Sequence, residues 1–477
     1  MKTVLDHTKA HQKYFEEMTK IPHGSYQEKA YADYLEEFAK QHGLRYIRDE
    51  LHNVIIYKEA SQGYADHPSV ILQAHTDMVC EKNKDVVFDF EKEQLQLRIQ
   101  DGYLYANGTT LGADDGVGVS YMLAILSDDT LSHPALECVF TVQEEVGLFG
   151  AMALKKEYFQ SKRMINLDDE GEISTCTTSA GGVNVLLSRK VVSSSCEKQG
   201  YRLSIRGLQG GHSGAAIHLE RGNANKLLVR VLYAIYEQYG LQFVSFDGGI
   251  KDNAIPREAD AIFVCDASKE QIDVIVSSFE KILKEELAFS DRNVSLMLES
   301  TSVSYVVSQE DSDKIMQLLL VLPTGMRHRS MHIEGLTMAS SNMAIVSLND
   351  EEIYVNCSVR GGMESYVDMQ ANEIVVLAKA FGFVSKLEAR YPAWSFVKDS
   401  ELRNIMQSVC QDVMHQELGL MAMHGGLECG VFKALIPDLD IVTLGPKMYD
   451  IHTPNEHLDL ASFDRTFTFL VQFLKCL

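Results

Sequence analysis

The chain has 477 residues, of which 45% are hydrophobic and 23% charged, and its formal net charge is -23 at pH 7. That length exceeds one ordinary core, so we expect two domains. The acidic charge argues against a nucleic-acid partner, and no apolar run reaches the ~20 residues that cross a bilayer, so no membrane partner is expected. Nine cysteines, an odd number without a C-x-x-C pair, favour a reducing compartment. The expected location is therefore the cytoplasm.

The chain begins with a helical pattern that Pro22 interrupts. Ser25 is followed three residues later by Glu28, which is the spacing of a capping box. This pair predicts the start of a second helix that continues to about Gln41.

Apolar runs then predict strands at 53–57, 69–74, 135–142 and 163–167, with a helix at 116–127. The segment 427–477 has the same character, with a strand at 440–444 and a closing helix. Strands that alternate with helices predict an α/β fold with a mostly parallel sheet.

The middle of the chain alternates strands and helices without acids clustered at strand ends. A strand is predicted at 201–206, a helix at 223–239 and a strand at 260–264. We therefore expect an inserted α+β lid domain at 185–394. The catalytic domain would then be discontinuous, comprising 1–184 and 395–477.

Short acidic and histidine motifs follow the predicted strands. They are His75-Thr76-Asp77, Asp114-Asp115, Glu144-Glu145, Asp168 and His452. Each alone has a plain structural explanation, such as a helix N-cap or a surface acid pair. Ligands of open α/β sheets bind at the carboxyl ends of the strands, so the motifs together predict one site at this edge.

These residue types suit a metal-dependent hydrolase. His75 and Asp77 lie two residues apart on an extended segment and so face the same side, where Asp77 can orient the imidazole. One carboxylate of the Asp114–Asp115 pair can bridge two cations ~3.5–4 Å apart. Of Glu144 and Glu145, one can bind metal while the other acts as general base. Mixed carboxylate and imidazole ligands without thiolate favour a catalytic zinc or manganese site.

Longer motifs carry a family resemblance. They are Ala74-His75-Thr76-Asp77-Met78-Val79, Thr109-Thr110-Leu111-Gly112-Ala113-Asp114, Asn253-Ala254-Ile255-Pro256-Arg257-Glu258-Ala259 and His424-Gly425-Gly426-Leu427-Glu428-Cys429-Gly430. Over nearly its whole length the chain resembles the co-catalytic dizinc exopeptidases, and among them the aminoacyl-histidine dipeptidases. The resemblance implies two Zn²⁺ per chain, with Mn²⁺ or Co²⁺ as alternatives.

The resemblance also implies roles for the site residues. His75 and Asp168 would bind one metal, Glu145 and His452 the other, and Asp114 would bridge them. Asp77 would orient His75, and Glu144 would be the general base. Relatives carry Asn after the bridging residue where this chain has Asp115, so which aspartate bridges stays open. In the family the peptide between these two residues is often cis.

Substrate contacts are implied in the same way. His212, in the loop Gln209-Gly210-Gly211-His212-Ser213-Gly214, would reach the scissile carbonyl as an oxyanion donor. Asn253 and Arg360 would contact the terminal carboxylate, Glu428 the free amine, and Gly445 would let substrate approach the backbone. Arg360 could equally be a surface charge, and Glu428 a partner in an internal salt bridge. Relatives also suggest a homodimer.

The expected function is metal-dependent hydrolysis of small dipeptides, aminoacyl-histidine peptides such as β-Ala-His in particular. The close alternative is another dizinc exopeptidase, or an aminoacylase, with a different substrate preference. A noncatalytic protein of this fold should have lost a ligand or the base. Here every such position is filled.

Overall fold

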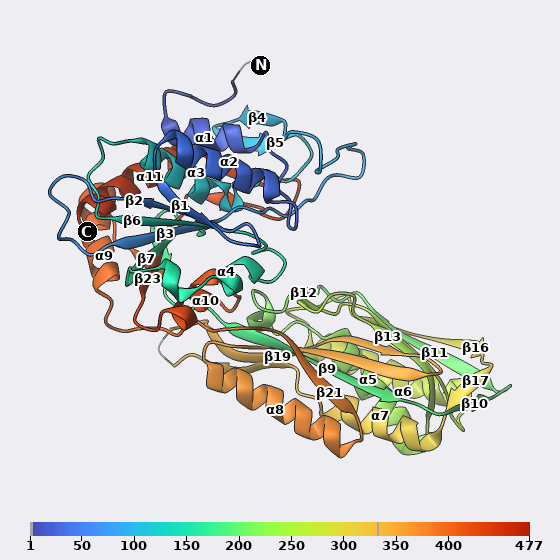
Figure 1. Ribbon diagram of the computed structural model, residues 1–477. Helices are drawn as coiled ribbons and strands as arrows, with labels where there is room; N and C mark the ends of the chain where they lie inside the picture. The colour runs from blue at the N-terminus through green and yellow to red at the C-terminus, as the bar shows by residue number, and fades with distance from the viewer. Residues whose placement is uncertain (1–2, 332) are drawn as a thin grey trace. The chain divides into compact units, whose positions relative to one another are not determined.

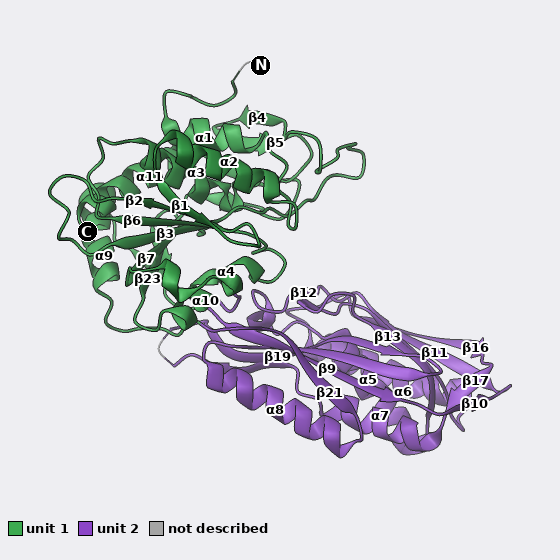
Figure 2. Cartoon of the chain, in the orientation of Figure 1, with its two compact units in different colours: residues 1–178, 394–422, 427–477 green, residues 179–393, 423–426 purple. Residues whose placement is uncertain are grey.

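The computed structural model describes residues 3–331 and 333–477, and the chain forms two compact units. Unit 1 comprises Met1–Thr178, Trp394–Ala422 and Leu427–Leu477, and unit 2 comprises Ser179–Ala393 and Met423–Gly426 (Figure 2). Both units combine helices with sheets, which confirms the predicted α/β class.

Unit 1 is built from short strands and eight helical segments within the described residues. The helices are α1 (Ala10–Met18), α2 (Lys29–Gln41), α3 (Ala113–Ser127), α4 (Phe149–Ala153), the 3-10 turn η1 (Lys156–Tyr158), α9 (Glu401–Met414), α10 (Glu428–Leu435) and α11 (Leu460–Lys475). The strands are β1 (Arg45–Arg48), β2 (Val54–Lys58), β3 (Val70–His75), β4 (Leu97–Gln100), β5 (Tyr103–Ala106), β6 (Leu136–Thr141), β7 (Arg163–Asn166), β8 (Ser174–Cys176), β22 (Gly419–Met421), β23 (Asp440–Thr443), β24 (Met448–Tyr449) and β25 (His457–Asp459).

The central sheet of unit 1 has the strand order β1-β2-β6-β3-β7-β23. Strands β6, β3, β7 and β23 run parallel, while β2 is antiparallel to both of its neighbours. Every residue of β3 and β6 is buried, as expected for strands covered on both faces. Helices α1, α2, α3 and α11 cover one face, and α4 and α10 lie on the other (Figure 1). The carboxyl ends of β6, β3 and β7 therefore meet at one edge of this three-layered packing.

The capping box predicted for Ser25 and Glu28 was wrong. Helix α2 begins at Lys29, and its N-terminal flanking residue Glu28 has helical dihedral angles and makes no side-chain cap. Ser25 Oγ instead donates to Asp77 Oδ2 at 2.8 Å, and Glu28 Oε1 accepts the backbone N–H of Gln143 at 3.1 Å. Both side chains thus bond to residues distant in the sequence, so neither caps the helix.

Unit 2 is dominated by one large sheet. The strands of the whole unit are β9 (Gly181–Lys190), β10 (Ser193–Ser195), β11 (Gln199–Arg206), β12 (Gly211–His212), β13 (Gln242–Gly248), β14 (Ala254–Ile255), β15 (Ala259–Val264), β16 (Ser295–Ser302), β17 (Tyr305–Val307), β18 (Gly325–Arg329), β19 (Thr337–Leu348), β20 (Glu352–Gly361) and β21 (Val384–Tyr391). Of these, β10 pairs with β17 and β12 with β14 outside the large sheet. The helices are η2 (Ile217–Leu219), α5 (Ala224–Tyr239), α6 (Lys269–Glu286), α7 (Gln309–Val321) and α8 (Glu364–Ala380).

The sheet of unit 2 is antiparallel, with the order β16-β11-β15-β13-β19-β20-β9-β21 and β18 paired to β19. Helices α5 to α8 lie along one face of it (Figure 1). The helix predicted at 223–239 is α5, and Asn223 caps it by accepting the N–H of Lys226. The core of unit 2 lies between the helices and the sheet, where Leu228, Phe243 and Phe263 are fully buried.

Among the helices of the described residues, none has the length and apolar character required to span a membrane.

Candidate metal centre

Three neighbouring parallel strands bring their carboxyl ends to the site. His75 is the last residue of β3 and pairs with Thr141 of β6, while Gln73 pairs with Asn166 of β7. The backbone continues from these pairs for two or three residues, to Glu144 on one side and Asp168 on the other. The predicted strand-end motifs are thus neighbours because parallel strands end at the same edge.

Two further side chains come from outside the sheet. Asp114 lies in the first turn of α3, with non-helical dihedral angles. His452 lies in the loop between β24 and β25, in the left-handed region at φ 62°. These two residues are more than 330 positions apart in sequence, yet Nε2 of His452 lies 3.1 Å from Oδ2 of Asp114.

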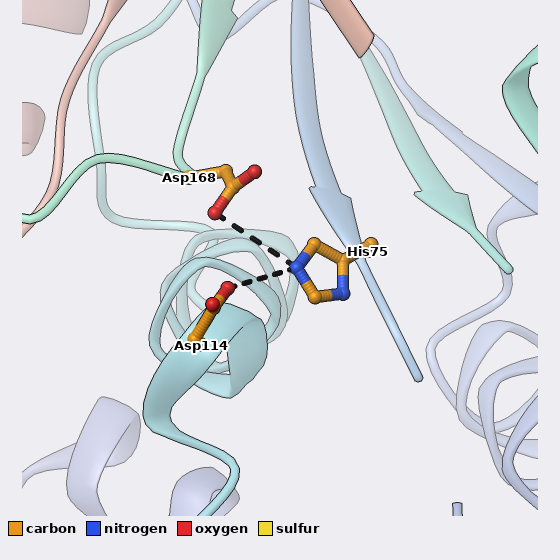
Figure 3. A group of neighbouring side chains, drawn as sticks. All are labelled: His75, Asp114 and Asp168. Carbon is orange, nitrogen blue, oxygen red and sulfur yellow. Dashed lines mark hydrogen bonds and ion pairs between the residues drawn. The ribbon is translucent and has the colours of Figure 1, made fainter. Parts of the chain in front are cut away.

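The five predicted ligands form two sets that share Asp114. His75 Nε2 lies 2.9 Å from Asp114 Oδ1 and 3.8 Å from Asp168 Oδ1 (Figure 3). His452 Nε2 lies 3.0 Å from Glu145 Oε1, next to the other oxygen of Asp114. Within each set the potential ligand atoms lie within 4.8 Å of one another. Each carboxylate oxygen of Asp114 therefore lies next to a different histidine, Oδ1 beside His75 and Oδ2 beside His452.

Burial and crowding of like charges perturb the acids of this cluster. Burial, with the charge of Asp114, raises the pKa of Asp168 well above its usual value, and burial likewise raises the pKa of Glu144 and Glu145. Burial opposes protonation of His452, but hydrogen bonds to Asp114 and Glu145 outweigh it and raise its pKa to about 11. Without metal the cluster thus holds protons that a cation would displace.

The donor set fits divalent metal ions. Each set has one imidazole nitrogen and two carboxylates, without a thiolate, which is the chemistry of catalytic rather than structural zinc. The shared aspartate can offer one oxygen to each of two ions. We conclude that the described residues fit two cations at this edge of the sheet.

Asp114 and Asp115 point in different directions. The side chain of Asp114 contacts both histidines, whereas Asp115 is 1% exposed and its Oδ1 accepts the N–H of Gly118 at 3.1 Å. The peptide between them is cis, as the resemblance implied. The geometry therefore favours Asp114 as the shared residue.

Asp77 is fully buried and organises two segments at once. His75 Nδ1 bonds to the backbone carbonyl of Asp77 at 2.9 Å, whereas its distance to the carboxylate is 3.6 Å. The carboxylate accepts the N–H groups of Glu144 at 3.0 Å and Glu145 at 3.3 Å. Asp77 thus orients the imidazole through its main chain and the two glutamates through its side chain.

Sequence reasoning missed several residues that support this site. Ser25 and Glu28 bind Asp77 and the backbone before Glu144, and their only sequence signal was the misleading capping pattern. Glu456 accepts the backbone N–H of Leu111 at 2.6 Å and of Ala113 at 2.8 Å, beside Asp114. No periodicity or spacing marks such a long-range contact.

Unit 2 brings together three other predicted residues. His212 ends β12, and its partner strand β14 begins directly after Asn253, whose carbonyl accepts the N–H of Ser213. His212 Nδ1 accepts the N–H groups of Gly214 at 3.3 Å and Ala215 at 3.1 Å, which puts the proton of a neutral ring on Nε2. That nitrogen lies 3.5 Å from Nη2 of Arg360.

Arg360, on β20, is only 7% exposed, so it is not the surface charge of the alternative interpretation. Its Nη1 donates to Tyr391 Oη at 2.8 Å, and across residues 3–331 and 333–477 no ion pair joins it to a carboxylate. His424, which begins one of the longer sequence motifs but was given no role, lies nearby, bonded to Ser340 Oγ at 2.7 Å. Burial, reinforced by the charge of Arg360, lowers the pKa of His424 to about 3.

The remaining predicted residues lie in unit 1. Glu428 opens α10, is fully buried, and accepts hydrogen bonds from Gln73 at 2.5 Å and Thr141 at 2.7 Å. Among the residues that the structure describes, it forms no salt bridge. Gly445 packs against the backbone of Asp169, where an added Cβ would overlap the carbonyl oxygen. That contact alone requires glycine at position 445.

Candidate metal ligands at the carboxyl ends of a parallel sheet, with the Glu144–Glu145 pair beside them, are the arrangement of a metal-dependent hydrolase. A family model described as "Peptidase family M20/M25/M40" matches residues 71–475. The chain belongs to this family and is a metallopeptidase.

Comparisons with individual proteins support the same family assignment. The chain is 35% identical over 467 residues to the cytosol non-specific dipeptidase of Escherichia coli K12, covering 97% of this chain and 96% of that one. The crystal structure of aminoacylhistidine dipeptidase from Vibrio alginolyticus matches with a TM-score of 0.88 and 30% identity, covering 98% and 96% of the two chains. An aminopeptidase from Bacillus cereus, with a TM-score of 0.56 and 16% identity over 99% of both chains, shares the fold.

Proposed function

We propose that this chain is a dipeptidase that hydrolyses aminoacyl-histidine dipeptides, β-Ala-His among them, with two zinc ions. The observation that carries this proposal is the pair of ligand sets sharing Asp114, with Glu144 beside them. Two relatives named as dipeptidases support the substrate class, one of them an aminoacylhistidine dipeptidase. The alternative is an exopeptidase of the same family with a different substrate preference, or an aminoacylase. The assay below distinguishes these from the proposed activity.

His75 and Asp168 would hold one ion, Glu145 and His452 the other, and Asp114 both. Mn²⁺ or Co²⁺ are alternative occupants of such ligands. When bound, the ions supply positive charge that polarises a peptide carbonyl and lowers the pKa of water.

Glu144 is the general base of the proposal. It takes a proton from the attacking water and gives it to the leaving amine. The Asp77 carboxylate accepts the N–H of Glu144 at 3.0 Å. This bond fixes the position of the backbone from which the Glu144 side chain extends. The neighbouring Glu145 is held by the same acceptor and turns to His452, so the two glutamates divide the roles of base and ligand.

For unit 2 we propose the role of substrate-binding lid. His212 Nε2–H and the guanidinium of Arg360 are both donors and so cannot bond each other; both suit a substrate oxygen. Arg360 lacks an internal carboxylate partner, which favours the terminal carboxylate of a dipeptide, with Asn253 nearby as a further polar contact. In unit 1, the buried Oε1 of Glu428 has no hydrogen-bond partner among the described residues and would suit the free amine, with Gly445 offering its backbone.

The test of the function is hydrolysis of β-Ala-His by metal-stripped protein, before and after two equivalents of zinc. We expect activity only after zinc is added, and higher kcat/KM for β-Ala-His than for N-acetyl-histidine. Hydrolysis of N-acetyl-histidine alone would make the chain an aminoacylase. Cleavage of unrelated dipeptides with equal kcat/KM would remove the histidine preference, and no cleavage of any of them with two zinc ions bound would overturn the proposal.

Arg360→Lys should lower kcat/KM for β-Ala-His by about 10–100-fold, because lysine keeps the charge but loses the planar pair of donors. The same dipeptide with an amidated C-terminus is the matched substrate, since it has no carboxylate to bind. We expect its slower hydrolysis to be unchanged by the substitution. An equal loss with both substrates would mean that Arg360 does not bind the carboxylate.

We propose that the enzyme is a cytoplasmic homodimer. Nine free cysteines and a relative named as cytosolic support the cytoplasm as the compartment, which cell fractionation would test.

The proposed dimer rests on one side of unit 2. Strand β21 is the edge of its sheet, and exposed apolar residues such as Val384 and, on α8, Val376 lie along this side. Light scattering should give twice the chain mass of 53.4 kDa, and a monomer at micromolar concentration would contradict the dimer.

A further inference from the structure

Glu456 is a buried carboxylate enclosed by main-chain donors. It is 2% exposed, and its Oε2 accepts the N–H groups of Leu111 at 2.6 Å and Gly112 at 3.1 Å. Its Oε1 accepts those of Ala113 at 2.8 Å and Asp114 at 3.4 Å. One side chain thus binds four consecutive residues that end at the shared metal ligand.

These four donors would otherwise lack partners. They lie on the segment that leads into α3, where the non-helical dihedral angles of Asp114 and Asp115 interrupt the helical hydrogen-bond pattern. The N-terminal flanking residue is Gly112, at φ 69°, which has no side chain to accept them. A carboxylate has two oxygens that can each accept more than one N–H group, and Glu456 supplies it from a segment over 340 residues away.

The loop that carries Glu456 also carries His452. Asp450 and His452 both have left-handed dihedral angles, at φ 52° and 62°, in a conformation that non-glycine residues rarely adopt. The N–H of Glu456 donates to the carbonyl of Thr453, and this bond closes a turn that spans residues 453–456, directly after His452. The loop therefore depends on its contacts elsewhere to hold this shape.

We propose that Glu456 is a positioning residue of the metal centre. It ties the loop of His452 to the backbone of Asp114 and so aligns the two side chains, whose Nε2 and Oδ2 atoms lie 3.1 Å apart. The inference rests on the proposed two-metal function, since it says how the shared ligand and one terminal ligand are aligned. Glu456 is not one of the proposed metal ligands or substrate-binding residues, and its role is to hold the backbone beside them.

The test compares Glu456→Gln with Glu137→Gln, a matched control. Glu137 is also a buried carboxylate that accepts main-chain N–H groups, those of Gln160 and Ser161, but it lies at the opposite end of β6 from the site. Glutamine has one acceptor oxygen and places an amide donor against the remaining N–H groups. Two readouts are taken on the metal-free proteins: amide hydrogen exchange at residues 111–114, and zinc affinity by calorimetry with a competing chelator.

We expect Glu456→Gln to speed exchange at residues 111–114 at least tenfold and to weaken zinc binding by about 10–100-fold, as for other residues that orient ligands. Glu137→Gln should change neither. If zinc affinity in Glu456→Gln equals that of the unmodified protein, the inference fails. Should Glu456→Gln not fold, Glu456→Asp, which keeps the charge but is too short to span both pairs of donors, decides by the same criterion.

The two proposals fail separately. An unmodified protein that binds fewer than two zinc ions contradicts the proposed function, whatever Glu456 does. In that case unchanged exchange at residues 111–114 in Glu456→Gln would also overturn the positioning role, because that readout needs no metal.

Discussion

Replacing Glu144 by glutamine is expected to lower kcat for dipeptide hydrolysis by about 10³-fold, within the range for loss of a general base. Glutamine has nearly the shape of glutamate but cannot accept the water proton. The main-chain N–H of residue 144 would still bond to Asp77, so the neighbouring Glu145 keeps its place at His452. Zinc content measured by mass spectrometry should therefore remain at two per chain.

Glu170 offers the matched control for this substitution. It is an exposed acid two residues beyond Asp168, at the same edge of the sheet, and it has no assigned role. Glu170→Gln removes the same charge near the site and should change kcat by less than about threefold, as expected for an exposed side chain. If Glu144→Gln kept a tenth or more of the activity with both metals bound, the base would have to be another group.

The ligand set could be predicted from the sequence because strand ends are local features. Each motif follows an apolar run, and parallel strands bring their carboxyl ends to one edge, so the meeting of His75, Glu145 and Asp168 follows from sheet geometry. The fold class follows from the same alternation of strands and helices. Asp114 and His452 lie outside the central sheet, so sheet geometry does not explain why they join the site, and their roles as ligands came from the family resemblance.

The supporting contacts could not be predicted in this way. Ser25 and Glu28 have the spacing of a capping box, yet both bond to segments 50 residues or more away. Asp77 was expected to orient His75 with its carboxylate, which instead holds the Glu144–Glu145 backbone. A carboxylate that accepts main-chain N–H groups has no preferred sequence partner, since every residue except proline offers the same donor. Such contacts therefore leave no trace in residue type or spacing.

Asp114→Asn should have the second large effect, a loss of bound metal. Each oxygen of Asp114 faces a different histidine, at 2.9 Å from His75 and 3.1 Å from His452. Asparagine replaces one of these oxygens with an amide group that cannot bind a cation, and it removes the negative charge between the two ligand sets. We expect fewer than one zinc per chain and a fall in kcat/KM of at least about 10³-fold, since bound metal contributes several kcal/mol to such reactions.

Asp115→Asn is the adjacent control, and the comparison settles which aspartate bridges. Asp115 faces the interior, where its Oδ1 accepts the N–H of Gly118 at 3.1 Å, and the side-chain oxygen of asparagine can accept the same hydrogen bond. Zinc content should stay near two per chain, with kcat/KM within about tenfold of the unmodified protein, a change of ~1.4 kcal/mol. Both substitutions replace the same side chain at neighbouring positions, so a difference between them reports the direction in which each carboxylate points. The reverse result, with metal lost only in Asp115→Asn, would assign the bridge to Asp115.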